Sequence, residues 1–150
     1  MIKKIILVLV ILFISIQFIR PEKNDNGYES ITAFEQETKP NPGVKKILRA
    51  QCYDCHSNQT KYPWYAEIAP VSWWLDHHIE EGKEHLNLAN WSEYSVKKKD
   101  HKLEEWIEEV EEGEMPLPSY SLIHGDLSEE ERELLINWAE GLREQYVDAD

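Results

Sequence analysis

The chain opens with an apolar run. Residues 5–19 are apolar except for Ser15 and Gln17, and lysines stand just before the run. A basic start followed by an apolar stretch is typical of an export signal, and this one lacks the small residues of a cleavage site. We therefore predict an uncleaved signal anchor over residues 1–20, with a cleaved signal peptide as the alternative. The run is shorter than the ~20 residues that a spanning helix usually needs.

The next segment has no helical periodicity. Residues 21–40 are polar, contain Gly27 and are bracketed by prolines, a composition typical of linkers. We predict that they form a flexible tether and that the folded domain covers residues 41–150.

Helical patterns then recur along the domain. Asn41 and Pro42 are typical of a helix start, so a helix is expected to lead to Cys52. A second helix is expected over residues 70–81, with Gly82 beyond its end. Residues 85–95 predict a loop with one helical turn.

Two amphipathic helices close the pattern. A helix over residues 96–112 has one apolar face, and Gly113 is expected to end it. The apolar positions of that face are Leu103, Trp106, Ile107 and Val110. After a proline-punctuated loop, Ser128 and Glu131 predict a capping box for a last helix, whose apolar residues are Leu134, Leu135, Trp138 and Leu142. No strand is expected, so the predicted fold class is all-α.

Charge and cysteine content narrow the function. The chain has 29 acidic and 16 basic residues, a formal charge of -13, which argues against binding nucleic acid. An acidic surface favours basic partners. Because Cys52 and Cys55 are the only two cysteines, neither a disulfide framework nor a four-cysteine zinc site is possible.

The two cysteines belong to the motif CYDCH at residues 52–56. In the pattern C-x-x-C-H, two thiols can form thioethers with a haem while the histidine binds its iron. Cys52, Cys55 and His56 would then hold one covalent haem c. A redox dithiol is an alternative, but it is usually preceded by a strand and followed by a helix. A zinc site is a further alternative, although adjacent ligands would strain its tetrahedral geometry.

The second axial ligand of such a haem has two candidates. Met115 lies in the sequence GEMPLPSY, where Pro116 and Pro118 stiffen the loop, so a thioether sulfur could be held at a fixed position. A thioether ligand raises the reduction potential of the iron. His85 is the alternative sixth ligand, and an open sixth position is also possible. The remaining histidines are expected elsewhere: at most one of His77 and His78 would point inward, while His101 and His124 would be solvated.

Other residues are expected to support the haem. The second ring nitrogen of His56 needs a backbone carbonyl, which we predict between Tyr62 and Pro70. Aromatic rings are candidates for packing on the haem face or binding a propionate: Trp64, Tyr65, Trp73, Trp74 and Trp91.

Over residues 41–142 the chain resembles small monohaem cytochromes c. It is more closely similar to the haem-binding domain family of membrane-anchored bacterial proteins, through CYDCHSNQTKYPWYAEIAPVSWW, GKEHLNLANW and GEMPLPSYSLIH. The resemblance implies a small cytochrome c-like helical domain around one haem. Familiar cytochromes have a glycine and an aromatic residue where their first and last helices cross; here Gly43 comes early, and the following apolar residues are aliphatic.

These observations predict an extracytoplasmic electron carrier, not an enzyme, with redox proteins as partners. It would be attached to the inner membrane by residues 5–19, or released if that segment is cleaved. The alternative is a pentacoordinate or bis-histidine haem protein that senses a gas or redox state or reacts with peroxide. A module in which haem only stabilises the fold is a third possibility.

Overall fold

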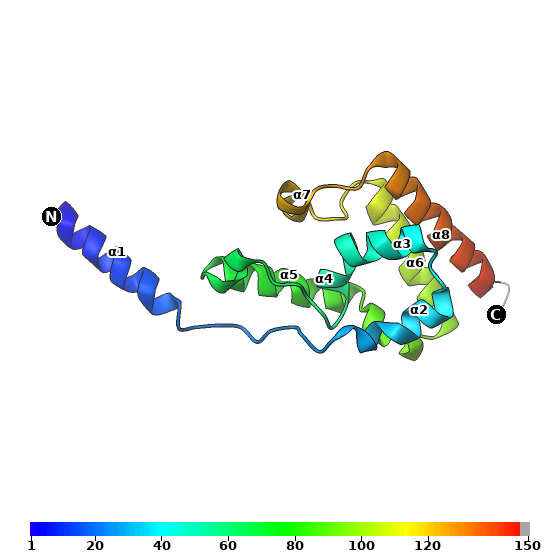
Figure 1. Cartoon of the computed structure of the whole chain (residues 1–150), viewed down its shortest axis with the longest axis horizontal. Helices are drawn as coiled ribbons and strands as arrows, with labels where there is room; N and C mark the ends of the chain where they lie inside the picture. Colours follow the sequence, from blue (N-terminus) through cyan, green and yellow to red (C-terminus); the bar gives the residue numbers. More distant parts are fainter. Residues whose placement is uncertain (148–150) are drawn as a thin grey trace.

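A computed structural model describes residues 1–147, which form helices joined by loops (Figure 1). The α-helices are α1 (Ile2–Ile16), α2 (Thr32–Thr38), α3 (Pro42–Ile47), α4 (Tyr53–His56), α5 (Val71–His85), α6 (Val96–Glu111), α7 (Pro118–His124) and α8 (Glu129–Val147). Short 3-10 or π turns are η1 (Tyr28–Ile31), η2 (Leu48–Cys52), η3 (Trp64–Glu67) and η4 (Leu88–Glu93). Within these residues the one extended pairing is an isolated bridge between Asp25 and Gln59, which confirms the all-α class.

The core lies between the long helices α6 and α8, which run side by side in Figure 1, and the shorter helices α2 and α3 packed against them. The predicted apolar face of α6 is buried, with Leu103 0% exposed. Ser128 caps α8 as predicted: its hydroxyl accepts from the Glu131 N–H at 3.3 Å, and the Glu131 carboxylate accepts from the Ser128 N–H at 3.1 Å. Leu134, one of the predicted apolar residues of α8, is not buried, because its exposed fraction is 37%.

The prediction of a flexible tether over residues 21–40 is wrong. This segment folds into η1 and α2, where Ile31 and Phe34 are completely buried in the core. The Phe34 ring meets the edge of Trp91 with centroids 5.3 Å apart. The folded domain therefore starts well before Asn41. The segment is polar because α2 presents only one short apolar face, too brief for a clear helical period.

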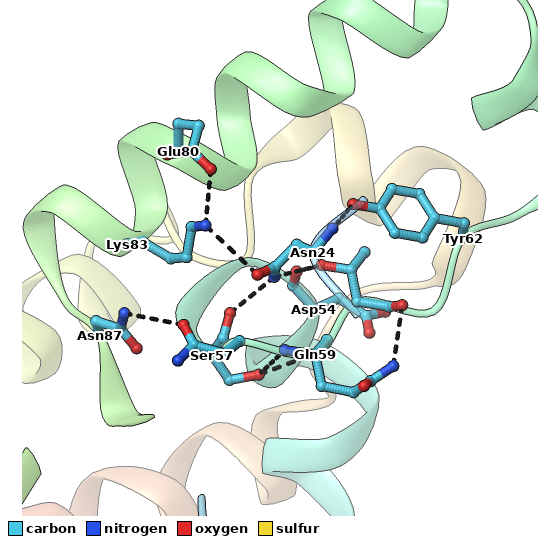
Figure 2. A network of polar contacts seen from close by, with 10 residues as sticks. Asn24, Asp54, Ser57, Gln59, Tyr62, Glu80, Lys83 and Asn87 are labelled. Atoms are coloured by element: carbon cyan, nitrogen blue, oxygen red, sulfur yellow. Dashed lines mark hydrogen bonds and ion pairs between the residues drawn. The ribbon is translucent and has the colours of Figure 1, made fainter. Parts of the chain in front are cut away.

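Polar contacts join this segment to the loop after α4 (Figure 2). The Asn24 side chain donates to the Ser57 carbonyl at 2.8 Å and to the Thr60 hydroxyl at 2.9 Å, and its backbone N–H donates to the Tyr62 hydroxyl at 2.7 Å. Asn24 is itself buried. Since buried polar groups need partners, these bonds fix the path of both segments.

Two helices differ from expectation. α5 does not end before Gly82 but continues to His85, so Gly82 is a helix-interior residue. The stretch expected as one loop after Met115 contains α7, which begins at Pro118. Proline is favoured in the first helical turn, where its missing N–H costs nothing.

α1 projects away from the other helices (Figure 1), and none of its residues is buried. It has 15 residues. Among the residues that the structure describes, no helix combines the length and apolar character needed to cross a membrane, so the predicted spanning anchor gains no support.

Candidate functional site: a cavity lined by the CYDCH segment and Met115

The CYDCH segment lies at the end of a nearly continuous helical stretch. Asn41 caps α3 by accepting from the N–H groups of Gly43 and Val44, as predicted. The chain then passes through η2 into α4, which ends at His56. Cys52 and Cys55 are separate free thiols, both partly exposed. The segment thus presents two thiols and an imidazole from adjacent helical turns.

A backbone carbonyl holds the imidazole of His56 through one of its two ring nitrogens. Its Nδ1 lies 2.9 Å from the carbonyl oxygen of Leu86, just after the end of α5. The predicted position of this carbonyl, between Tyr62 and Pro70, is therefore wrong. With Nδ1 protonated and bonded, Nε2 is left free to bind a metal. Burial also lowers the pKa of His56, which favours the neutral ring that metals require.

Gly82 explains how α5 comes so close to the cysteines. A Cβ atom at this position would lie 2.9 Å from the carbonyl oxygen of Cys55 and 3.2 Å from the Cys55 Cβ. Only a residue without a side chain fits this contact. Gly82 therefore serves helix packing at the site rather than helix termination. The sequence did contain a signal for this packing role, because a lone glycine lies within a helical pattern.

A cavity of about 640 Å³ lies in front of these residues. Its lining includes all four predicted haem-binding residues and the alternative ligand: Cys52, Cys55, His56, Met115 and His85. The volume falls in the range of ~300–1,000 Å³ typical of ligand and cofactor sites. The structure thus gathers around one space residues that lie up to 63 positions apart in the sequence.

Met115 reaches the cavity from the loop after α6. The backbone N–H groups of Glu114 and Met115 both donate to the Glu109 carbonyl at 3.0 Å. The Arg132 guanidinium donates to the Val110 carbonyl and so ties the same helix end to α8. Met115 is half-buried and packs against the core.

The other histidines differ in whether they line the cavity. His85 lines the cavity but is exposed, whereas His101, with its side chain 60% exposed, lies outside it. Of the adjacent pair, His78 lines the cavity and His77 is 67% exposed, as predicted. His124 is exposed, yet its Nε2 lies 2.7 Å from the Tyr65 hydroxyl, so it is not simply solvated.

The aromatic predictions are wrong for this cavity. None of the five proposed rings lines it; Trp91 is a core residue, and Trp64 is 78% exposed. The rings that do line it are Trp106 and Tyr120. The sequence pattern predicts Trp106 as part of an apolar helix face and Tyr120 as a loop residue. A helical period identifies buried positions but cannot tell which of them border a cavity.

The structure gives no support to the other two interpretations of the cysteines, the redox dithiol and the zinc site. Burial raises the pKa of Cys52 to about 12 and that of Cys55 to about 11, whereas a reactive dithiol needs a stabilised thiolate. For zinc, no group of three or more His, Cys, Asp or Glu side chains suited to a metal occurs within residues 1–147.

The lining of the cavity includes charged side chains. It carries Glu81, Glu105, Glu108 and Glu109, together with Lys102. The Lys102 ammonium lies 2.6 Å from Glu105, and this hydrogen bond lowers the pKa of the carboxyl. The lining also includes four buried leucines: Leu86, Leu88, Leu127 and Leu135. It thus combines buried apolar side chains with more exposed charged ones.

A second, smaller cavity of about 310 Å³ shares part of its wall with the first. The residues common to both are Cys55, His78, Leu117 and Tyr120. Its other walls come from the start of α5, including Val71 and Trp74, from α7, and from Asp54 and the chain that follows α4.

Comparison with protein families identifies the chain. A family model described as a haem-binding domain matches residues 11–141. This chain belongs to the haem-binding domain family. A search of curated proteins and a search of solved structures each found no match. The family match includes α2 and the preceding segment, in agreement with their packing into the domain.

The cavity suits the cofactor that the family name implies. A porphyrin needs an apolar slot and a donor atom for the iron, and the lining of this cavity includes buried leucines and the imidazole of His56. The imidazole of His56 is a neutral nitrogen donor oriented by the Leu86 carbonyl. Sequence reasoning found the donors, but it missed Gly82 and Leu86, which position them.

Proposed function

We propose that the haem-binding domain carries one c-type haem, joined covalently to Cys52 and Cys55, with His56 and Met115 as axial ligands, and that it transfers single electrons. The observation that supports this most strongly is that both thiols, His56 and Met115 line one cavity of cofactor size. When bound, the haem supplies one-electron exchange at its iron. Each thiol would add its S–H across a vinyl group, so no other product is released.

The protein contributes orientation and exclusion of water. The Leu86 carbonyl accepts a hydrogen bond from the His56 Nδ1–H, and Gly82 allows α5 to cover Cys55. Met115 is the better-placed sixth ligand because it is half-buried against the core, whereas His85 is exposed. A thioether ligand would favour the reduced iron.

Electrophoresis under denaturing conditions, followed by haem staining, tests covalent attachment. Protein made with a cytochrome c maturation system should give a stained band that survives denaturation, and Cys52→Ala/Cys55→Ala should give none. A colourless wild-type band would rule out a covalent haem.

A second candidate rests on the position of His85 at the cavity wall. Bis-histidine ligation, or an open sixth position, would suit a gas or redox sensor or a peroxide-reactive haem. The weak far-red sulfur-to-iron band of the oxidised protein separates these cases. It should be present in wild type and in His85→Ala and absent in Met115→Ala. A wild type without this band would favour the second candidate.

We further propose that the domain works on the extracytoplasmic side, attached to the membrane through α1, with redox proteins as partners. The support is the apolar surface of α1, which no other part of the described chain covers, and the lysines at its start. With a formal charge of -13, the domain would favour basic partners, and their association should weaken with added salt. If α1 is cleaved after export, the mass of the mature protein will reveal it.

A further inference from the structure

The apolar helix α1 does not hang from a loose linker. The side-chain amide of Gln17, at its end, donates to the Ala69 carbonyl at 3.1 Å and accepts from the Ala69 N–H at 2.9 Å. These paired bonds join residues that are 52 positions apart. Because both backbone polar groups of one residue, Ala69, are used, the contact fixes orientation as well as distance.

Further contacts reinforce the same joint. The Trp73 indole N–H donates to the Ile19 carbonyl at 2.7 Å. Arg20 and Lys23 both pair with the Glu67 carboxylate, at 2.8 Å and 2.5 Å. The segment that follows α1 is thereby held against η3 and the first turn of α5, the end of the domain that lies nearest α1 in Figure 1.

Large apolar side chains around this joint are exposed. They come from the segment after α1, from η3 and its following loop, and from the first turn of α5. We call this set the collar: Phe18, Ile19, Trp64, Ile68, Val71 and Trp74. Phe18 is 84% exposed and Trp64 78%, whereas Trp91, in the core, is 0% exposed. An exposed apolar group of this size marks an interaction surface.

The charges beside the collar suit one kind of partner. Arg20 and Lys23 both pair with Glu67, so together with the neighbouring Glu22 and Asp25 this corner is close to neutral, on a chain whose formal charge is -13. Tryptophan next to basic residues is the composition of segments at the headgroup level of a membrane. A basic protein partner would be expected to meet an acidic patch instead.

We infer that the collar lies in the interface of a lipid bilayer and holds the domain in one orientation on the membrane. This inference rests on the proposed attachment through α1. The collar continues the exposed apolar surface of α1, and the Gln17–Ala69 joint prevents the two from separating. The second cavity, lined by Val71 and Trp74, would then open close to the membrane surface.

Vesicle flotation tests the inference with the full haem-loaded chain and phosphatidylcholine–phosphatidylglycerol vesicles. Trp64→Ser should weaken partitioning into vesicles by about tenfold, the effect of one large apolar side chain lost from the interface. The matched control is Leu122→Ser, since Leu122 is 86% exposed on α7, outside the collar. It should change partitioning less than about twofold.

Hydroxyl-radical footprinting gives an independent measurement. Vesicles should protect Trp64 from oxidation and leave Val147, 64% exposed at the far end of α8, unchanged. Equal partitioning of Trp64→Ser and wild type, or equal oxidation of Trp64 with and without vesicles, would refute the collar while leaving attachment through α1 intact. A wild-type chain that does not float with vesicles would refute both, and haem staining would be unaffected in either case.

Discussion

The two walls of the haem cavity are held very differently. On one wall, His56 is bonded to Leu86, α5 is packed onto Cys55 at Gly82, and Asn24 ties the N-terminal segment to the loop behind the motif. The facing wall includes the Met115 loop and α7, which has no buried residue. The contacts that hold the first wall in place are all made between residues of the protein and do not require the cofactor.

This difference has a consequence for the ligands. The position of His56 is set by hydrogen bonds and close packing that exist without the cofactor. Met115 is fixed through its backbone, while the α7 residues that follow it have few partners, with Leu122 86% exposed. We therefore expect the sixth ligand to respond more readily to mutation or to competing ligands than the fifth.

The largest effect is expected in the segment that supports the first wall. Phe34→Ala should lower the free energy of unfolding by about 3–5 kcal/mol, because it leaves a void beside Trp91. Leu122→Ala, on the facing wall, should change it by less than about 0.5 kcal/mol. Chemical denaturation followed by circular dichroism measures both. Similar losses in the two variants would mean that the walls are equally well packed.

Gly82 gives the next largest effect. Gly82→Ala should destabilise the protein by about 1–3 kcal/mol, since the new methyl group would collide with the backbone of Cys55. The control is Gly141→Ala in α8, where a Cβ meets nothing within 4 Å. That change should stabilise the helix by up to about 1 kcal/mol. Thermal denaturation distinguishes the signs, and a stabilised Gly82→Ala would contradict the close contact.

Asn24→Ala tests the polar support of the first wall. It removes three side-chain hydrogen bonds, to Ser57, Thr60 and Lys83, and leaves the buried Ser57 carbonyl without this donor, at an expected cost of about 1–2 kcal/mol. Hydrogen exchange of the Thr60 amide, which donates to the Asn24 carbonyl at 2.8 Å, should become faster. Unchanged exchange would show that the bridge does not depend on the Asn24 side chain.

The smallest effect is expected at the link between the walls. Tyr120, on α7, donates its hydroxyl to the Ala50 carbonyl at 2.9 Å. Because this bond is exposed, Tyr120→Phe should cost less than about 1 kcal/mol in global stability. Faster hydrogen exchange should be confined to α7. A spread of faster exchange into α4 or α5 would show that the first wall also depends on this link.

Much of the fold followed from local patterns. The caps at Asn41 and Ser128 and the apolar face of α6 are confirmed, since each depends on residues within a few positions of one another. The fold of residues 21–40 could not be predicted this way. Ile31 and Phe34 are isolated apolar residues whose burial depends on distant partners such as Trp91.

The candidate site shows the same difference between short sequence patterns, which could be predicted, and contacts with distant residues, which could not. C-x-x-C-H and the Met-Pro loop are compact signals, and the structure brings them to one cavity. The supporting contacts were missed because Leu86 acts through its backbone and Gly82 through the absence of a side chain. A backbone contact does not depend on the residue type at Leu86, and a glycine at position 82 fits a helix end as well as a close contact between helices.

α5 starts at Val71, beside the collar, and ends at His85, next to the carbonyl that orients His56. Its 15 residues span about 22 Å at ~1.5 Å per residue. With the collar in the bilayer interface, the length of this one helix would set the height of the iron above the membrane. One residue added to α5 would raise the iron by ~1.5 Å and rotate it by ~100° about the helix axis, so a redox partner would approach it from a different direction.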